Sequence, residues 1–340
     1  MFKEVNNGAI SAQIAKGWKP NAYLTNMSVA YFQPDDWFVS PFIFPLLPVP
    51  LSTGNYYIFD KGDLARDNVQ RKPKFGKVTP MTFGSKVDSY STDVDQVIIG
   101  LDQISTLDYQ RANTPGISDP RRAKVRLATE QLKLHSDRIF ADGYFKTGIW
   151  SNEYTGVTST PSGKQFYKFN DANFDAVHFF GNLRTEMMRN GRRKPNVLAL
   201  GVEAYEGLKC NPEILERVKY SGSTANPATI NQNVLAQLLE IDRVVVLNST
   251  YNAGGIGSTD MQFVCDSKGA LLCYAAPNPA IDEVSAGYTL AWDMLGNGQY
   301  LAFDQWQGES GTHSEFIEGL ISYTPKKICD ELGYFMTGCV

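Results

Sequence analysis

Apolar positions recur at three- and four-residue spacing through residues 118–146, as they do on one face of a helix. Ser118 and Asp119 are candidate N-caps, and Pro120 suits the first helical turn. The segment therefore predicts one long helix, on whose apolar face His135 would be a satisfied core histidine rather than a ligand. That face consists of Val125, Ala128, Leu132, His135 and Ile139.

The chain beyond this helix alternates between helical and strand patterns, which predicts an α/β region. Residues 147–170 are rich in Gly, Ser and Thr and predict a loop or a small hairpin. An amphipathic helix follows from Phe174 to Asn190, with one side at Phe174, Val177, Gly181, Arg184 and Met188. Strands are expected at 196–200, 242–249, MQFVCD and ALLCYAA, and helices at 202–209 and 227–240. A further helix is expected from Pro212, with Asn211 as its cap. The segment EGLISYTPKKICDELGYFMTGCV predicts a strand, a turn and a strand.

Residues 1–50 predict an extended N-terminal arm. Prolines interrupt the strongly apolar stretch from Trp37 to Leu51, and proline disfavours both a helix and a central strand. A strip this apolar is expected to lie along a surface, either of its own chain or of a neighbour. A buried loop within one domain explains the same composition equally well.

Residues 54–105 predict a long two-stranded excursion with segregated charges. Its first strand runs from Tyr56 to Phe59, and β-branched and aromatic residues mark the return. Opposite charges can pair between identical copies and set their register, although a solvated hairpin explains the charges as well. The basic residues are Lys61, Arg66, Arg71, Lys72, Lys74 and Lys77, beside Asp63 and Asp67; the acidic return carries Asp88, Asp93, Asp95, Asp102 and Asp108.

Basic residues crowd the start of the long helix, where the helix dipole disfavours cations. They are Arg121, Arg122, Lys124 and Arg126. Their position suggests a nearby anion, either neighbouring carboxylates or the phosphates of a nucleic acid. A solvated basic face is the simpler interpretation of the same residues.

The overall composition is that of an ordinary globular protein, with 43% hydrophobic and 20% charged residues. The formal net charge of -4 excludes a chain-wide signal for nucleic-acid binding, so any such contact would need a local patch. The 5 cysteines form no CxxC pair, which favours reduced, mostly buried thiols over disulfides or a zinc site. No stretch resembles a signal peptide or a membrane helix, so we expect neither export by such a signal nor a membrane anchor.

The sequence carries no strong catalytic constellation, and we expect neither an enzyme nor a cofactor. Gly254, Gly255 and Gly257 follow a strand, as in a phosphate-binding turn, but the GxGxxG spacing is missing and a strand rather than a helix is expected next. No GxxxxGK[ST], GxSxG or HExxH motif occurs. His178 and His313, like His135, have no convincing catalytic partners.

The second half of the chain contains a more specific string. PNVLALGVEAYEGLKCNPEILERVKYSG is followed by LAQLLEIDRVVVLNSTYNAG and later by ALLCYAAPNPAIDEVSAGYTLAWD. This order resembles the lambda-type head protein E family of tailed-bacteriophage major capsid proteins. The resemblance covers roughly residues 190–340, whereas residues 50–146 agree in order and length only. The matching positions are Val197–Leu200, Ala204–Leu208, Asn211–Tyr220, Leu235–Leu239, Arg243–Asn252, Gly287, Tyr288, Thr289 and Trp292.

The resemblance implies an α+β architecture, the Hong Kong 97-type capsid fold. It comprises an N-terminal arm, a long β-hairpin called the E-loop, a peripheral domain on a long spine helix and an α/β axial domain. The implied boundaries are 1–50 for the arm, 51–108 for the E-loop, 109–190 for the peripheral domain with the spine helix at about 118–146, 191–300 for the axial domain and 301–340 for C-terminal strands that return to the peripheral domain.

The implied function is that of a shell protein, forming pentamers and hexamers of an icosahedral virion capsid around double-stranded DNA. The E-loop of such shells lies over an adjacent subunit, and the start of the spine helix would face the DNA through Arg121, Arg122, Lys124 and Arg126. The implied inter-subunit contacts of the E-loop are Lys61, Arg66, Arg71, Lys72, Lys74, Lys77, Asp88, Asp93 and Asp95. Expected partners are further copies of the chain, DNA without sequence specificity, and portal, scaffolding and decoration proteins. No long charged helical region precedes the arm, so scaffolding would be a separate protein or absent.

Three other functions compete with this interpretation. An encapsulin-type shell shares the fold but encloses protein cargo, and the lambda-type string argues against it. An α/β enzyme using residues 196–290 would work as a small oligomer. A phage tail or adaptor protein would form rings or tubes. The capsid interpretation further predicts that deleting residues 1–50 abolishes assembly while the α/β region still folds.

Overall fold

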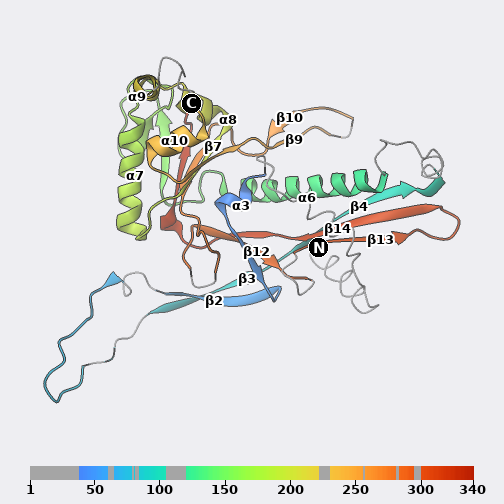
Figure 1. Cartoon of the computed structure of the whole chain (residues 1–340), viewed down its shortest axis with the longest axis horizontal. Helices are drawn as coiled ribbons and strands as arrows, with labels where there is room; N and C mark the ends of the chain where they lie inside the picture. The colour runs from blue at the N-terminus through green and yellow to red at the C-terminus, as the bar shows by residue number, and fades with distance from the viewer. Residues whose placement is uncertain are drawn as a thin grey trace.

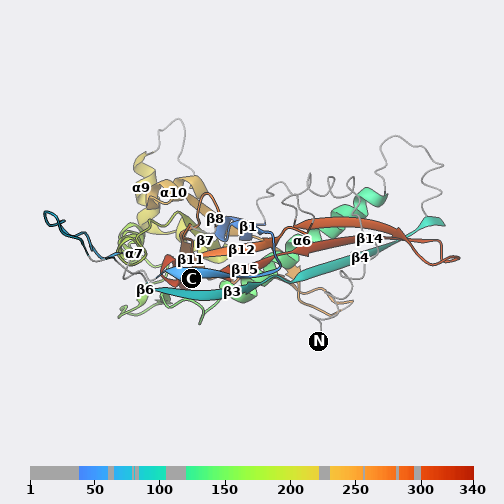
Figure 2. The same ribbon diagram turned by 90° about the horizontal axis from the view of Figure 1, so that it is seen from below.

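The computed structural model describes residues 38–59, 65–78, 80, 84–104, 120–221, 230–255, 257–280, 283–294 and 300–340. Helices gather at one end of the molecule, and one long helix runs beside extended strands toward the other end (Figures 1 and 2). A narrow hairpin projects from the body below them (Figure 1). Within the described residues no helix is long and apolar enough to cross a membrane.

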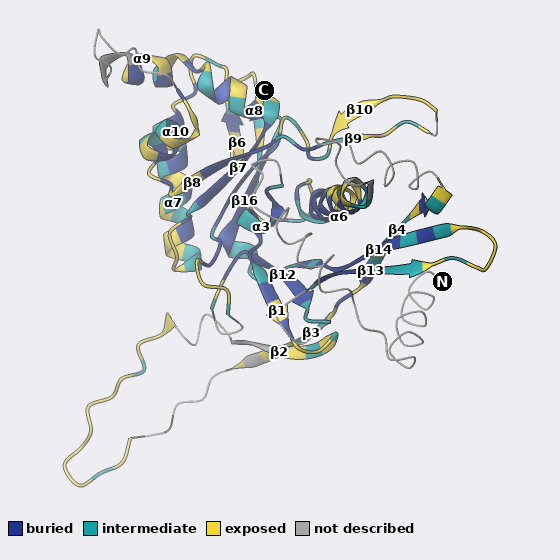
Figure 3. Ribbon diagram, turned by 45° about the vertical axis from the view of Figure 1, so that its right-hand side comes forward, coloured by how far each residue is buried: buried dark blue, intermediate teal, exposed yellow. Residues whose placement is uncertain are grey.

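A mixed six-stranded sheet forms the centre of the helical end, in the order β6-β5-β16-β11-β7-β8. The central strands are uninterrupted runs of buried side chains, as expected where layers cover both faces of a sheet. Its strands are β5 (Glu153–Val157), β6 (Gln165–Tyr167), β7 (Val197–Gly201), β8 (Arg243–Leu247), β11 (Ala270–Cys273) and β16 (Gly333–Thr337). The surrounding helices are α7 (Ala176–Gly191), α8 (Val202–Lys209), α9 (Pro212–Ser221) and α10 (Gln232–Leu239), as Figure 3 shows.

The long helix α6 (Pro120–Tyr144) confirms the expected helix. It lies along the antiparallel sheet β13-β14-β4, which comprises β4 (Val94–Asp102), β13 (Leu301–Gln307) and β14 (Ser314–Ser322). Val125, Ala128 and Leu132 are buried against this sheet. Nearer its C-terminus, Phe140 enters the core of the helical end, so α6 spans two hydrophobic clusters.

The expectation that His135 is a core residue is wrong. Its side chain is half-exposed and its Nε2 lies 3.3 Å from Asp95 Oδ2 on β4. The next two positions, Ser136 and Asp137, are buried instead. The helix therefore buries the polar side chains of Ser136 and Asp137, which the three- and four-residue spacing of apolar positions did not predict.

A third sheet, β1-β12-β15, packs beneath α6 and corrects the extent of the arm. It contains β1 (Leu46–Val49), β12 (Gly287–Trp292) and β15 (Thr324–Lys327), and the short helix α3 (Ser40–Ile43) precedes it. Ile43 and Phe44 are buried in the main core, and β1 pairs in parallel with β12. From residue 38 onward, the apolar strip is therefore packed within its own chain; residues 1–37 lie outside the described part.

This packing also changes the expected outcome of deleting residues 1–50. The ring of Phe44 contacts Phe140, Tyr144 and Trp150, with centroids 5.2, 5.1 and 6.4 Å away. A Cβ on Gly287 would lie 2.5 Å from the Phe44 ring, so this glycine is needed for the close fit. Removing these residues would open the core, so the α/β region is not expected to fold normally without them.

The expected excursion consists of two separate parts. β2 (Thr53–Phe59) and β3 (Ser85–Ser91) form an antiparallel pair, whereas β4 leaves this pair and joins β14. The acidic return is thus divided between the hairpin and the sheet beside α6.

Another two-stranded sheet, β9 (Thr250–Asn252) and β10 (Met261–Phe263), confirms that a strand follows the glycine-rich turn.

Several further details differ from the sequence-based expectations. The buried side of α7 is formed by Ala176, Phe180, Leu183 and Met187, whereas Met188 is exposed, so the expected face was wrong. The described part of α10 begins at Gln232, with Asn231 as its N-cap. Of the C-terminal strands, β13 and β14 lie beside α6, but β16 lies between β5 and β11 in the six-stranded sheet. The domain boundaries themselves stay a prediction.

Candidate functional site

The segment 65–78 is the most exposed part of the hairpin. Exposed fractions of 91% for Val69 and 98% for Phe75 leave both side chains in solvent. The turn that presents Phe75 is closed by the Gly76 N–H, which donates to the Pro73 carbonyl at 3.1 Å. The predicted contact residues Arg66, Arg71, Lys72, Lys74 and Lys77 are all exposed here, and Lys61 lies outside the described residues.

Basic and apolar groups alternate closely along this segment. Lys74 Nζ lies 5.8 Å from the centroid of the Phe75 ring, close enough for a cation–π contact. Phe75 adopts φ 66°, a conformation that is rare for a bulky residue. We define this strip, residues 65–78, as the hairpin tip. It resembles an interaction surface in combining exposed aromatic and cationic side chains.

The predicted acidic contacts lie elsewhere, and each of the three makes a contact within the chain. Asp88 Oδ2 accepts from the Tyr56 hydroxyl at 2.8 Å and lies 3.0 Å from Lys326 Nζ on β15. Asp95 pairs with His135. Asp93 follows β3 and is tied through its backbone N–H, which donates to Thr324 Oγ1 at 3.2 Å. Asp88 therefore connects the hairpin to β15, and Asp95 connects β4 to α6, so neither is paired with the basic tip.

The hydrogen bonds around Asp88 shift its titration. The Tyr56 hydroxyl, followed by the Lys326 ammonium, stabilises the carboxylate and lowers the pKa of Asp88. Burial, followed by the adjacent carboxylate, raises the pKa of Tyr56. Lys326 Nζ also donates to the Ser89 carbonyl and lies 5.1 Å from the centroid of the Tyr56 ring. We call Tyr56, Asp88 and Lys326 the hairpin-base cluster.

The basic start of α6 finds carboxylates for two of its cations. Arg121 Nη2 donates to Glu315 Oε2 at 2.9 Å, and Glu315 is only 2% exposed. Arg126 pairs with Glu130 one turn later, at 3.1 Å. Arg122 is exposed and Lys124 is half-buried. The sequence suggested either a carboxylate or a phosphate as the anion beside these cations, and the pattern of charges could not distinguish them. For Arg121 the anion is the carboxylate of Glu315.

A buried polar junction around Asp137 was missed by the sequence analysis. Its Oδ2 accepts from the Ser249 hydroxyl at 3.0 Å, and its Oδ1 accepts from the Ser40 N–H at 3.4 Å. The Tyr323 hydroxyl donates to Ser40 Oγ at 2.8 Å. Burial is the main cause of a raised pKa at Asp137, partly offset by these hydrogen bonds. The junction joins α6, α3 and the loops after β8 and β14.

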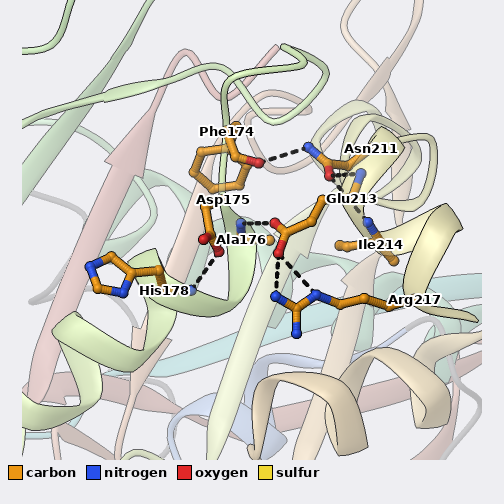
Figure 4. A network of polar contacts seen from close by, with 8 residues as sticks. All are labelled: Phe174, Asp175, Ala176, His178, Asn211, Glu213, Ile214 and Arg217. Atoms are coloured by element: carbon orange, nitrogen blue, oxygen red, sulfur yellow. Dashed lines mark hydrogen bonds and ion pairs between the residues drawn. The ribbon is translucent and has the colours of Figure 1, made fainter.

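A second network holds the N-termini of α7 and α9 together (Figure 4). Its cap at Asn211 confirms the sequence-based expectation, whereas the contacts with the start of α7 were missed. The buried Asn211 Nδ2 donates to the carbonyls of Phe169 and Phe174, at 2.9 and 3.2 Å. Its Oδ1 caps α9 by accepting from the N–H groups of Glu213 and Ile214. Glu213 Oε2 accepts from the first N–H of α7, that of Ala176, at 3.1 Å. These hydrogen-bond donors and acceptors pair with one another, so the network connects the two helix N-termini and has a structural role.

The described residues contain no group of three or more His, Cys, Asp or Glu side chains that could hold a metal ion. His178 and His313 are exposed and lie on α7 and before β14 respectively. Cys265, Cys273 and Cys339 are buried, and the cysteines are free thiols, as expected.

Comparison with known proteins supports the resemblance found in the sequence. No family model matches the chain. A curated protein, the major capsid protein of Burkholderia phage BcepMu, is 23% identical over 230 residues, which cover 67% of this chain and 68% of that protein. Assignment to the lambda-type branch in particular stays a prediction.

Solved structures share the fold. A phage-related protein from Bordetella bronchiseptica RB50 has a TM-score of 0.70 at 19% identity, covering 94% of this chain and 97% of that one. The virus-like particle from Pyrococcus furiosus has a TM-score of 0.52 at 10% identity, covering 93% and 98%. The capsid of cyanophage P-SCSP1u has a TM-score of 0.50 at 9% identity, covering 87% of both chains. The chain has the Hong Kong 97-type capsid fold and is similar in sequence to a phage major capsid protein.

Proposed function

We propose that this chain is the major capsid protein of a tailed bacteriophage, assembling as pentamers and hexamers into an icosahedral shell around double-stranded DNA. The hairpin tip carries this proposal, because Val69 and Phe75 are almost fully exposed, as expected of apolar side chains that become buried against a neighbouring copy. The capsid fold and the curated relative support the same function. The role is structural, and we propose no catalytic activity and no cofactor.

The tip would contact an adjacent copy through its basic residues. Closed shells repeat one heterologous contact many times, so a modest contact per copy suffices. Asp88 is already paired with Lys326 of the same chain, and Asp95 with His135. Both are therefore weaker candidates for direct contact with another copy than the cations of the tip. Further partners would be portal, scaffolding and decoration proteins. The protein would be made in the bacterial cytoplasm and reside in the virion.

The basic start of α6 would face the packaged DNA, without sequence specificity. Arg122 and Lys124 are the best candidates, because Arg121 compensates the buried Glu315 and its loss would destabilise the fold. Replacing Arg122 and Lys124 by Gln should reduce genome retention more than shell assembly. Matched Gln substitutions at the exposed Lys146 and Lys194 should affect neither. Normal genome retention with defective shells would contradict the assignment.

An encapsulin-type shell around protein cargo is the second candidate, because a shared shell fold does not determine what the shell encloses. The relation to a phage major capsid protein favours DNA as the content. The two differ in what copurifies with closed particles made during phage growth: nuclease-protected DNA or a defined protein.

Negative-stain electron microscopy of the purified protein, alone and co-expressed with candidate scaffolding proteins, tests the proposal. We expect closed icosahedral particles, or rings of five and six subunits. Small discrete oligomers under both conditions would reject a shell function and return attention to the α/β region. Tubes would indicate the tail or adaptor function instead.

A further inference from the structure

The hairpin β2–β3 leaves the body without a backbone ladder to guide it. Among the described strands, β2 and β3 pair only with each other, as a separate two-stranded sheet. No ladder of backbone hydrogen bonds to the body therefore fixes the angle at which the hairpin projects (Figure 1). Besides the short connections to β1 and β4 and the packing of Tyr90, polar side-chain contacts at the base restrain that angle.

The hairpin-base cluster is placed to do so. Tyr56 and Asp88 lie opposite each other on the two strands. A side chain that contacts both of them therefore restrains β2 and β3 together. The Lys326 ammonium lies 3.0 Å from the Asp88 carboxylate, faces the Tyr56 ring and donates to the Ser89 carbonyl. The side chain of Lys326 is 25% exposed and that of Asp88 41%, so the ion pair is partly shielded from water on the Lys326 side.

Lys326 is itself held by the body. It lies on β15, opposite Tyr288 of β12. The neighbouring Pro325 carbonyl accepts from the Tyr144 hydroxyl of α6 at 2.8 Å. The cluster thus continues into the long helix. A seven-residue strand is about 23 Å long, so a tilt of about 10° at the base would move its far end by about 4 Å.

We infer that Tyr56, Asp88 and Lys326 form a clamp that sets the direction of the hairpin before copies meet, and so positions the tip for its contact with a neighbouring copy. This inference rests on the proposed shell function. A segment that is already oriented loses less conformational freedom on binding, so the clamp favours assembly without contributing to the interface. Asp88 acts inside the chain, in contrast to the direct inter-subunit role expected from the sequence.

The first measurement is the distance distribution between spin labels in the unassembled protein. One label is attached to the exposed native Cys210 and the other to Cys at position 70 in Gln70→Cys, with Cys329→Ser to remove the half-buried thiol. Lys326→Met removes the ammonium and keeps the aliphatic chain. Asp88→Asn keeps the shape of the side chain and removes its charge. Lys86→Met, on the exposed part of the same hairpin, is the matched control.

The second measurement is the yield of closed particles at a fixed protein concentration. We expect both cluster variants to broaden the distance distribution and to lower the yield by about tenfold, as the loss of a charge-assisted hydrogen bond predicts. Lys86→Met should change neither. An unchanged distribution, or a normal yield, in the folded cluster variants overturns the clamp. Failure of the wild type to form shells rejects the shell function, whereas the label distances still show whether the cluster orients the hairpin.

Discussion

The helical end and the hairpin use aromatic side chains in opposite ways. Phe44 is fully buried and contacts three other aromatic rings, whereas Phe75 has no comparable cover and is 98% exposed. The helical end buries its aromatic rings within one chain. The hairpin is joined to the body by a few polar contacts and by the packing of Tyr90, and its tip keeps Val69 and Phe75 exposed. The buried aromatic side chains stabilise the subunit, whereas the exposed side chains of the tip are available for contact with another copy.

The largest expected effect comes from breaking the aromatic contacts of the helical end. Phe44→Ala should lower the free energy of unfolding by about 3–5 kcal/mol, because it removes a buried ring and leaves a cavity between α6 and β12. Urea denaturation of the unassembled protein measures the loss. Leu51→Ala, seven positions along and 64% exposed, should change it by less than about 0.5 kcal/mol. Equal effects of the two substitutions would contradict the assigned burial.

The polar joint between α7 and α9 should have the next largest effect. Asn211→Ala removes the cap of α9 and leaves buried carbonyls without donors, which should cost about 2–4 kcal/mol of unfolding free energy. Asn173 lies in the loop before α7 that Asn211 contacts, and its amide donates to the Asp171 side chain, so Asn173→Ala is the matched control. A loss below about 1 kcal/mol at Asn211 would mean that water replaces its hydrogen bonds.

Local pattern predicted much of the helical end and less of the hairpin. Helix α8 begins and ends where the sequence indicated, and β7 and β8 were recognised from their continuous apolar runs. Each of these signals lies within a few residues along the chain. The Hong Kong 97-type fold itself came from a longer string of matching positions, which the structural comparison confirms.

The missed features depend on residues that are distant in sequence. Charge order alone placed Asp88 opposite the basic tip, but its partner Lys326 lies 238 positions away, on a strand that the fold brings beside the hairpin. Asp137 was hidden in a helix because its partners Ser40 and Ser249 come from both sides of it in the chain. The buried Glu315 likewise gave no local sign that it would meet Arg121.

The two regions should also respond to pH in opposite directions. The pKa of Asp137 is raised by burial, so its contribution to stability is complete below its usual pKa and is lost as pH rises through the raised value. The pKa of Asp88 is lowered, so its contribution is present above the usual pKa and is lost as pH falls through the lowered value. Rising pH should thus weaken the junction, and falling pH should loosen the hairpin.

Isosteric variants separate these two contributions. The difference in unfolding free energy between wild type and Asp137→Asn should decrease as pH rises from about 4 to about 8. For Asp88→Asn, hydrogen exchange of the β2 and β3 amides should match the wild type only at strongly acidic pH, where both side chains are uncharged. Pairing with Lys326 and the Tyr56 hydroxyl is the source of this second effect. A pH-independent difference at either site would show that the carboxyl does not titrate as its surroundings indicate.

The smallest effect on the isolated subunit is expected at the tip, where the contrast with Phe44 is sharpest. Phe75→Ala removes a ring that is already in water, so the free energy of unfolding should change by less than about 0.5 kcal/mol. It should nevertheless reduce the yield of closed particles, because exposed aromatic side chains are typical anchors of protein contacts. Particle yield at fixed concentration measures this, with Phe263→Ala on the separate hairpin β9–β10 as an exposed aromatic control. A destabilised subunit would show that Phe75 packs on its own chain, and normal particle yield would remove the tip from the interface.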